Sequence, residues 1–194
     1  MKWDYEFDVV VIGSGNGALT SALCSHDGGA KTLVIEKSTQ FGGTSATSGG
    51  GVWIPNNRYA KAENVDDSDQ DARDYINSVS PEGKIKDELV ETYLSEGPKM
   101  IDYLHENSQV KYRNLAHYPD YFPDNPGGKA GNRSMEPEPI YGTKLGKDLG
   151  KLREQHPQTA FTMGPINMNF TQVEGQLLLG ALPGWKSLFA KLFT

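Results

Sequence analysis

The chain has few of the residues that disulfide-bonded and metal-binding proteins require. A single cysteine, Cys24, among 194 residues excludes an intramolecular disulfide and a zinc cluster held by thiolates. Cys24 falls in a predicted helix, where we expect a small buried side chain without a redox role. The four histidines show no metal-ligand spacing with acidic residues or with the cysteine: His26, His105, His117 and His156. We therefore expect no metal site.

An excess of positive charge and long apolar runs are also absent. The net charge of −6 and the isoelectric point near 5.2 give no basic surface for nucleic acid. No apolar run approaches the ~20 residues that span a bilayer, and the charged first four residues do not resemble a secretory signal. The hydrophobic fraction of 37% is low for a compact α/β enzyme. We expect a cytoplasmic protein without a membrane span or a nucleic-acid partner.

The first informative pattern is an apolar run that enters a glycine-rich turn. Residues 7–12 are apolar apart from Asp8, and the last four of them are β-branched. The run stops at Gly13, which predicts a buried strand followed by a tight turn. Residues 13–18 then fit G-x-G-x-x-G/A, with Ala18 at the third small position. In this motif Gly13 permits the turn, and Gly15 lets backbone N–H groups approach a pyrophosphate. The pattern predicts a dinucleotide-binding turn.

A helix and a second strand follow this turn. The helix, from about residue 17 to residue 25, would direct its positive end at the phosphates. Residues 32–35 predict a second buried strand that ends in Glu36, 23 residues after Gly13. An acid at this spacing suits a ribose hydroxyl. A glycine turn with only a structural role is the alternative, but this context favours a dinucleotide.

Two further glycine-rich turns indicate which dinucleotide binds. Residues 42–45 and 48–51 are glycines and small hydroxyl residues within 15 residues of Glu36. Such backbone can pack under a flat ring system and donate N–H groups to phosphate or ring oxygens. The arrangement resembles the FAD-binding half of the fumarate reductase and ketosteroid dehydrogenase flavoproteins, a flexible glycine loop being the alternative. We expect FAD, bound by Gly13, Ser14, Gly15, Asn16, Gly17, Ala18, Glu36, Lys37, Gly42, Gly43, Thr44, Ser45, Ser48, Gly49 and Gly50.

Helices are predicted between residues 66 and 107. Asp66, Ser68 or Asp69 could cap the first of them. Its inward face would comprise Ala72, Tyr75, Ile76 and Val79. Residues 86–96 and 98–107 predict two more helices meeting at Gly97-Pro98, with an inward face of Leu89, Val90, Tyr93, Leu94, Met100, Ile101 and Leu104. His105 would face solvent or the negative helix end.

Residues 112–146 are rich in proline and glycine, which predicts an irregular, rigidly turned segment in place of helix or strand. Long structured loops of this kind often carry function or cover a site. The centre of the segment, residues 117–128, is HYPDYFPDNPGG. From these residues alone, an aromatic loop packed on its own domain is the favoured interpretation, and a functional loop is the alternative.

Several of these segments together resemble one family. Residues 3–146 are similar to the N-terminal part of the 3-ketosteroid Δ1-dehydrogenases. The resemblance is carried by residues 13–18, Glu36-Lys37, residues 41–50, Trp53 to Asn57, residues 118–128, Arg133-Ser134 and Glu136-Pro137. It implies an FAD-dependent dehydrogenase that acts on the CH–CH bond of a 3-ketosteroid, with hydride passing to flavin N5.

The resemblance also implies one catalytic residue. A tyrosine of the Pro-Asp-Tyr loop reaches the active site in that family, and the matching residue is Tyr121. It would stabilise the phenolate of a catalytic tyrosine that lies further along, because a phenol of pKa ~10 is a poor base at neutral pH. Tyr118 is the fallback, with packing as its favoured role.

The expected fold is α/β: an incomplete Rossmann-like FAD-binding β-α-β unit, then helices and a Pro/Gly-rich loop leading into a substrate or cap region. We expect residues 1–146 to form the N-terminal part of the FAD-binding domain and residues 147–194 to begin the substrate region. Near the C-terminus, Trp185, Leu188, Phe189, Leu192 and Phe193 form an apolar helical stripe that needs a partner. We therefore expect a fragment, inactive alone, whose partner is the missing C-terminal part of the same enzyme.

Two other functions stay open. One is a fumarate reductase-like flavoprotein, although its dicarboxylate site needs arginine and histidine where this loop offers tyrosine and proline. The other is a non-catalytic remnant or interaction module that binds FAD. The sequence identifies neither the electron acceptor nor the particular ketone.

Overall fold

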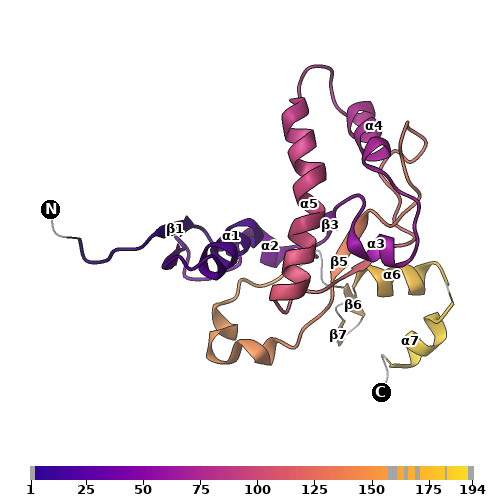
Figure 1. Cartoon of the computed structure of the whole chain (residues 1–194). Coiled ribbons are helices and arrows are strands. Elements are labelled where there is room, and N and C mark those ends of the chain that lie inside the picture. The colour runs from indigo at the N-terminus through magenta and orange to yellow at the C-terminus, as the bar shows by residue number, and fades with distance from the viewer. Residues whose placement is uncertain (1–2, 157–160, 164–165, 169–170, 182, 192–194) are drawn as a thin grey trace. The chain divides into compact units, whose positions relative to one another are not determined.

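The computed structural model describes residues 3–156, 161–163, 166–168, 171–181 and 183–191 (Figure 1). The chain forms two compact units. The first comprises Met1–Gly50 and Ile140–Asn169, and the second comprises Gly51–Pro139 and Phe170–Thr194. The predicted domain boundary after residue 146 remains a prediction.

A β-α-β element begins the first unit. Strand β1 (Val9–Ile12) and strand β2 (Thr32–Ile35) pair in parallel through helix α1 (Asn16–Asp27). The prediction that these strands are buried is wrong, because the side chain of Ile12 is 82% exposed. In a two-stranded sheet, alternate residues face opposite sides, and the face that carries Ile12 is uncovered in the described chain.

The predicted burial of Cys24 is also wrong. Its side chain is exposed on α1. Every residue of α1 is described, and none of its side chains is fully buried. The helix is correctly predicted, but its cysteine contributes no core packing.

The rest of the first unit contains a short helix, a 3₁₀ helix and a hairpin. Helix α2 (Gly43–Thr47) begins inside the second glycine-rich segment, residues 42–45, where only a turn was predicted. The chain returns as the 3₁₀ helix η1 (Gly142–Lys151) and then as strands β6 (Phe161–Met163) and β7 (Ile166–Met168), which pair antiparallel.

The second unit is built on a three-stranded antiparallel sheet. Its strand order is β3 (Val52–Trp53), β5 (Ser134–Pro137) and β4 (Tyr112–Asn114). The prediction of neither helix nor strand over residues 112–146 is therefore wrong for β4, β5 and the start of η1. Cross-strand partners remote in sequence supply the hydrogen bonds of β4 and β5.

The helices described in the second unit are α3 (Arg58–Ala62), α4 (Asp69–Val79), α5 (Asp87–Asn107), α6 (Gln172–Leu179) and α7 (Trp185–Lys191). The predicted cap of α4 is confirmed, because the Ser68 hydroxyl accepts a hydrogen bond from the Asp71 N–H at 3.0 Å. Ala72 and Tyr75 of the predicted inward face are buried, Ile76 is half-buried and Val79 is exposed.

Helix α5 is continuous where two helices were predicted. Pro98 lies inside it, although an interior proline costs about 3 kcal/mol. Both halves of α5 are buried: Val90 and Leu94 pack with Ala72, and Ile101 and Leu104 pack with Ile54, Tyr112 and Met135. This packing keeps the helix intact across the proline. The inward assignments of Leu89 and Tyr93 are wrong, since these residues are 60% and 42% exposed.

His105 lies in the last turn of α5, as predicted, but its partner is a phenol. Its Nδ1 is 2.8 Å from the Tyr59 hydroxyl, and the two rings meet edge to face. The same hydroxyl accepts a hydrogen bond from the Tyr112 N–H at 2.9 Å. His105 therefore serves the packing of α3 against α5 and β4.

The predicted C-terminal helix is present as α7, with Leu188 half-buried and Phe189 exposed. Leu192 and Phe193 of the predicted stripe lie outside the described residues. In the part of the chain that the structure describes, no helix combines the length and apolar character needed to cross a bilayer.

Candidate functional site

A pocket of about 610 Å³ lies in the first unit at the carboxyl ends of β1 and β2. Backbone and small side chains of the first glycine turn (residues 13–18), the second glycine turn (residues 42–45) and the end of β2 line it. The lining residues are Ile12, Gly13, Ser14, Gly15, Ile35, Glu36, Lys37, Ser38, Gln40, Gly43, Thr44 and Arg153. The predicted nucleotide residues Gly13, Ser14, Gly15, Glu36, Lys37, Gly43 and Thr44 are thus brought together.

The two glycine turns meet at this pocket. Gly13 has φ +97°, a conformation that side chains rarely adopt. Gly15 has an ordinary φ of −73°, so its conformation does not require glycine. A Cβ on Gly43 would lie 3.4 Å from the Gly15 Cα, and a Cβ on Gly15 would lie 3.4 Å from the Ser45 hydroxyl oxygen. The turns are close enough to form one backbone cradle.

A serine links the cradle to the acid of β2. The buried Ser14 hydroxyl donates a hydrogen bond to Glu36 Oε2 at 2.5 Å and accepts one from the Gly42 N–H at 2.9 Å. Glu36 Oε1 accepts another from the Ser38 N–H at 3.0 Å. The Ser14 hydrogen bond, followed by that from Ser38, lowers the pKa of Glu36. Glu36 is therefore held as a carboxylate that can accept hydrogen bonds from a ribose.

The other predicted nucleotide residues support the cradle or lie apart from it. The Ser45 hydroxyl accepts a hydrogen bond from the Asn16 N–H at 3.0 Å, which joins α2 to the first turn of α1. Asn16, Gly17, Ala18, Gly42, Ser45, Ser48, Gly49 and Gly50 are not among the residues that line the pocket. Arg153, which does line it, was missed, because nothing in its local sequence indicates that residues 151–153 return to Phe41.

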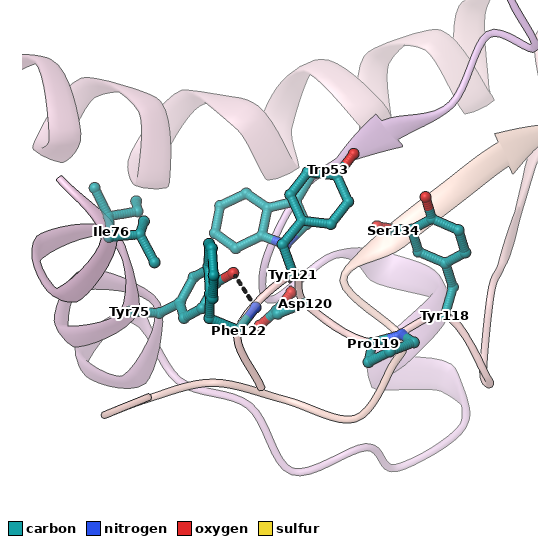
Figure 2. Close-up of a pocket in the computed structure, with 10 residues that line it drawn as sticks. Trp53, Tyr75, Ile76, Tyr118, Pro119, Asp120, Tyr121, Phe122 and Ser134 are labelled. Carbon is teal, nitrogen blue, oxygen red and sulfur yellow. Dashed lines mark hydrogen bonds between the residues drawn. The ribbon is translucent and has the colours of Figure 1, made fainter. Parts of the chain in front are cut away.

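A second pocket, of about 320 Å³, lies in the second unit (Figure 2). Its walls are mainly aromatic and aliphatic. They comprise Trp53, Tyr75, Ile76, Val79, Tyr118, Pro119, Asp120, Tyr121, Phe122 and Ser134. The Tyr-Pro-Asp-Tyr segment forms one wall opposite α4, so this pocket contains the predicted catalytic residue and its fallback.

The loop is fixed on both sides of Tyr121. The Asp120 carboxylate accepts hydrogen bonds from the Trp53 indole N–H at 2.6 Å and from the Lys129 N–H at 3.0 Å. The Phe122 N–H donates to the Tyr75 hydroxyl at 3.3 Å (Figure 2). The side chain of Tyr121 between them is 83% exposed. The backbone of Tyr121 is therefore held while its phenol remains accessible.

A buried arginine completes this support. Arg133 is 1% exposed and pairs with Asp120 at 2.8 Å and with Asp67 at 2.7 Å. Its guanidinium also lies over the rings of Trp53 and Tyr75, at 5.6 and 5.8 Å from their centroids. Three segments remote in sequence are joined through this one side chain. The sequence analysis quoted Arg133 but assigned it no role.

Tyr118 and Tyr93 keep their hydroxyl protons at neutral pH. Burial, followed by the interaction with Tyr121, raises the pKa of Tyr118. Burial also raises the pKa of Tyr93, whose hydroxyl donates to the Trp53 carbonyl. At neutral pH Tyr118 is thus a hydrogen-bond donor and not a base. Across the described ranges, no group of three or more histidine, cysteine, aspartate or glutamate side chains is arranged to hold a metal ion.

The sequence of the chain matches a family model over most of its length. Residues 8–179 match the family described as FAD binding domain. The match includes both glycine turns, the residues of the second pocket, and Arg153.

Several known proteins are similar to the chain. The 3-oxosteroid 1-dehydrogenase of Mycolicibacterium smegmatis is 38% identical over 168 residues, which are 87% of this chain and 29% of the relative. That of Mycobacterium tuberculosis is 39% identical over 163 residues, covering 84% and 28% of the two proteins. The 4-oxocyclohexanecarboxylate 2-dehydrogenase of Sinomonas cyclohexanicum is 37% identical, covering 81% and 27%.

A solved structure is similar over nearly the whole chain. It is a 3-ketosteroid Δ1-dehydrogenase from Sterolibacterium denitrificans in complex with 1,4-androstadiene-3,17-dione, 37% identical with a TM-score of 0.85. The similarity covers 95% of this chain and 32% of that one. The chain thus spans about a third or less of the proteins that it matches.

Proposed function

We propose, from the premise that this chain belongs to the FAD binding domain family, that it is part of an FAD-dependent 3-oxosteroid 1-dehydrogenase. One observation carries the proposal: the aromatic pocket beside Tyr121 lies in a chain 38% identical to 3-oxosteroid 1-dehydrogenases. The complete reaction, its substrate and its electron acceptor belong to this proposal, because the chain spans only 29% of that relative.

The first pocket fits FAD. The β1–α1–β2 element would serve as the start of a Rossmann-like domain, with the pyrophosphate at the Gly13–Gly15 turn and the N-terminus of α1. No acidic residue lies in the first turn of α1 to repel it. Glu36 would accept hydrogen bonds from the ribose, and the contact of Gly43 with Gly15 leaves no side chain in the way.

The second pocket suits a flat, apolar ring system. When bound, FAD supplies the acceptor for the hydride that leaves the ring. Trp53, Tyr75 and Phe122 would bury apolar faces of a steroid, and the neutral phenol of Tyr118 could donate a hydrogen bond to an oxygen. The accessible phenol of Tyr121 would stabilise a neighbouring phenolate, which makes it the proposed catalytic residue.

Direct binding measurements test the proposal on the 194-residue chain. The purified protein is expected to show a flavin spectrum and to release FAD on denaturation. Addition of 1,4-androstadiene-3,17-dione should quench the fluorescence of Trp53, which lines the pocket. A Trp53→Phe variant identifies that signal among the three tryptophans. A protein that binds FAD but no steroid would overturn the substrate assignment and leave the cofactor assignment intact.

A smaller cyclic ketone is the second candidate substrate. The similarity to the 4-oxocyclohexanecarboxylate 2-dehydrogenase favours it, at 37% identity. Preferential binding of 4-oxocyclohexanecarboxylate over the steroid would select this candidate. A fumarate reductase-like reaction has weaker support: the NADH:fumarate oxidoreductase of Klebsiella pneumoniae is 28% identical over 101 residues. Among the described residues that line the second pocket, none is an arginine or histidine that could bind a dicarboxylate.

A further inference from the structure

We propose that Arg153 is a cofactor-binding residue that neutralises phosphate charge on the ADP half of FAD. The inference rests on the cofactor site of the proposed function and adds a residue from the far end of the first unit. Arg153 lines the pocket formed by the two glycine turns and the end of β2. It is more than 100 residues from those turns in the sequence, and no glycine motif includes it.

The backbone beside Arg153 is fixed against the second glycine turn. The Phe41 N–H donates to the Lys151 carbonyl at 2.9 Å, and the Arg153 N–H donates to the Phe41 carbonyl at 2.9 Å. These two bonds form a parallel bridge between Phe41 and Leu152. Leu152 lies against Gly42, since a Cβ there would be 3.2 Å from Leu152 Cδ1. Arg153 is thus held at the pocket through its backbone, and its side chain is exposed.

The charges of the pocket favour an anionic ligand beside this arginine. The charged residues that line it are Glu36, Lys37 and Arg153. Glu36 is already hydrogen-bonded by Ser14 and by the Ser38 N–H. Among the residues that the structure describes, no carboxylate forms an ion pair with Arg153. A guanidinium in this position can bind phosphate oxygens with two parallel hydrogen bonds.

Titrations of the 194-residue chain with FAD and with ADP, followed by flavin fluorescence and by calorimetry, test this role. We expect Arg153→Ala to weaken both ligands about 10-fold, as for the loss of one hydrogen bond to a charged group. Arg153→Lys should recover part of this loss, because it keeps the charge but not the two parallel hydrogen bonds, and Arg153→Gln should lose about as much affinity as Arg153→Ala. The wild-type affinity should fall with added salt more steeply than that of Arg153→Ala, because salt screens the exposed ion pair.

Lys147→Ala is the matched control, because Lys147 is an exposed cation in η1 outside the pocket. It should leave both affinities unchanged. Equal affinities of Arg153→Ala and the wild type would overturn the inference while the cofactor site stands. Adenosine, which has no phosphate, is titrated by calorimetry as well, and an equal loss of its affinity in Arg153→Ala would overturn the phosphate contact in favour of stacking on the base. A wild-type chain that binds neither ligand would overturn the inference together with the cofactor site.

Discussion

At the scale of single residues, one hydroxyl joins three parts of the nucleotide pocket. Ser14 lies in the first glycine turn, donates to Glu36 at the end of β2 and accepts from the N–H of Gly42 in the second turn. An alanine there would leave the Gly42 N–H without its acceptor and the carboxylate without its strongest hydrogen bond. The serine therefore controls both the shape of the cradle and the charge of the acid.

We expect Ser14→Ala to make FAD binding more sensitive to acid. The hydrogen bond from Ser14 lowers the pKa of Glu36, so the carboxylate persists above that lowered pKa and its interaction is lost as the pH falls through it. Without the bond, the loss should begin at a higher pH. FAD titrations between about pH 4 and 7, around the ordinary glutamate pKa, measure this shift.

Ser21→Ala is the control for this variant, because the Ser21 hydroxyl donates a hydrogen bond within α1, to the Gly17 carbonyl. Its pH profile should coincide with that of the wild type. If the profiles of Ser14→Ala and the wild type coincide, the charge of Glu36 does not contribute to FAD binding.

Gly15→Val should abolish FAD binding. The φ of Gly15 allows a side chain, but its Cβ would lie 3.4 Å from the Ser45 oxygen, and the branches of valine would fill the cradle. The flavin content of the purified variant measures the effect. Gly150→Val is the control, since a Cβ there meets nothing within 4 Å and Gly150 is not among the residues that line the pocket. Unchanged flavin content in Gly15→Val would show that the FAD phosphates do not bind at this turn.

Tyr121→Phe should lower steroid turnover about 100-fold, a usual contribution of a proton-transfer group, and leave the flavin bound. The reason is that the variant removes only the hydroxyl proposed to stabilise a phenolate. The measurements are turnover of a 3-ketosteroid with a dye as electron acceptor and the flavin content of the same protein, in a longer enzyme that contains this chain. Together they distinguish a loss of catalysis from a loss of the cofactor. Tyr141→Phe is the control, because Tyr141 is also 83% exposed but lies outside both pockets. Normal turnover in Tyr121→Phe would return Tyr121 to a packing role.

At the scale of elements, the second pocket depends on contacts between short segments. Strand β3 has two residues, and the loop after β4 has no regular structure around Tyr121. Such short segments have little stability alone, so their arrangement depends on the ion pairs that Arg133 forms with Asp67 and Asp120. The buried network therefore determines the shape of the loop.

Arg133→Met should destabilise the second unit by about 3 kcal/mol or more, because it leaves two buried carboxylates without their cation. Urea unfolding followed by tryptophan fluorescence measures the change. Arg58→Met is the control: its pairs with Asp102 and Glu106 are largely exposed, so a loss of at most about 1 kcal/mol is expected. Equal losses in the two variants would contradict a special role for the buried network.

At the scale of the whole molecule, two units each carry one part of the proposed chemistry. The first contains the nucleotide pocket and the second contains the aromatic pocket. The chain spans less than a third of the 3-oxosteroid 1-dehydrogenases that it matches. Because each unit contains one of the two pockets, FAD binding and steroid binding can be tested independently of each other.

The local pattern of the sequence determined the elements whose signal lies within a few residues. The β-α-β element, the glycine turns, the Ser68 cap and the core positions of α5 follow from periodicity, turn residues and capping, which act over one or two helical turns. The spacing of Gly13 and Glu36 predicted a dinucleotide, and the two further glycine-rich segments, which resemble those of flavoproteins, predicted FAD. The family match agrees with this expectation.

The tertiary structure decided what depends on residues far apart in the chain. Strands β4 and β5 exist through cross-strand pairing, and α5 remains continuous across Pro98 because both of its halves are packed. Arg133 pairs with two carboxylates that lie 13 and 66 positions earlier in the sequence. Arg153 lies at the nucleotide pocket because the neighbouring Leu152 forms a backbone bridge with Phe41. No local pattern encodes these contacts, because each depends on where the whole chain places its partner.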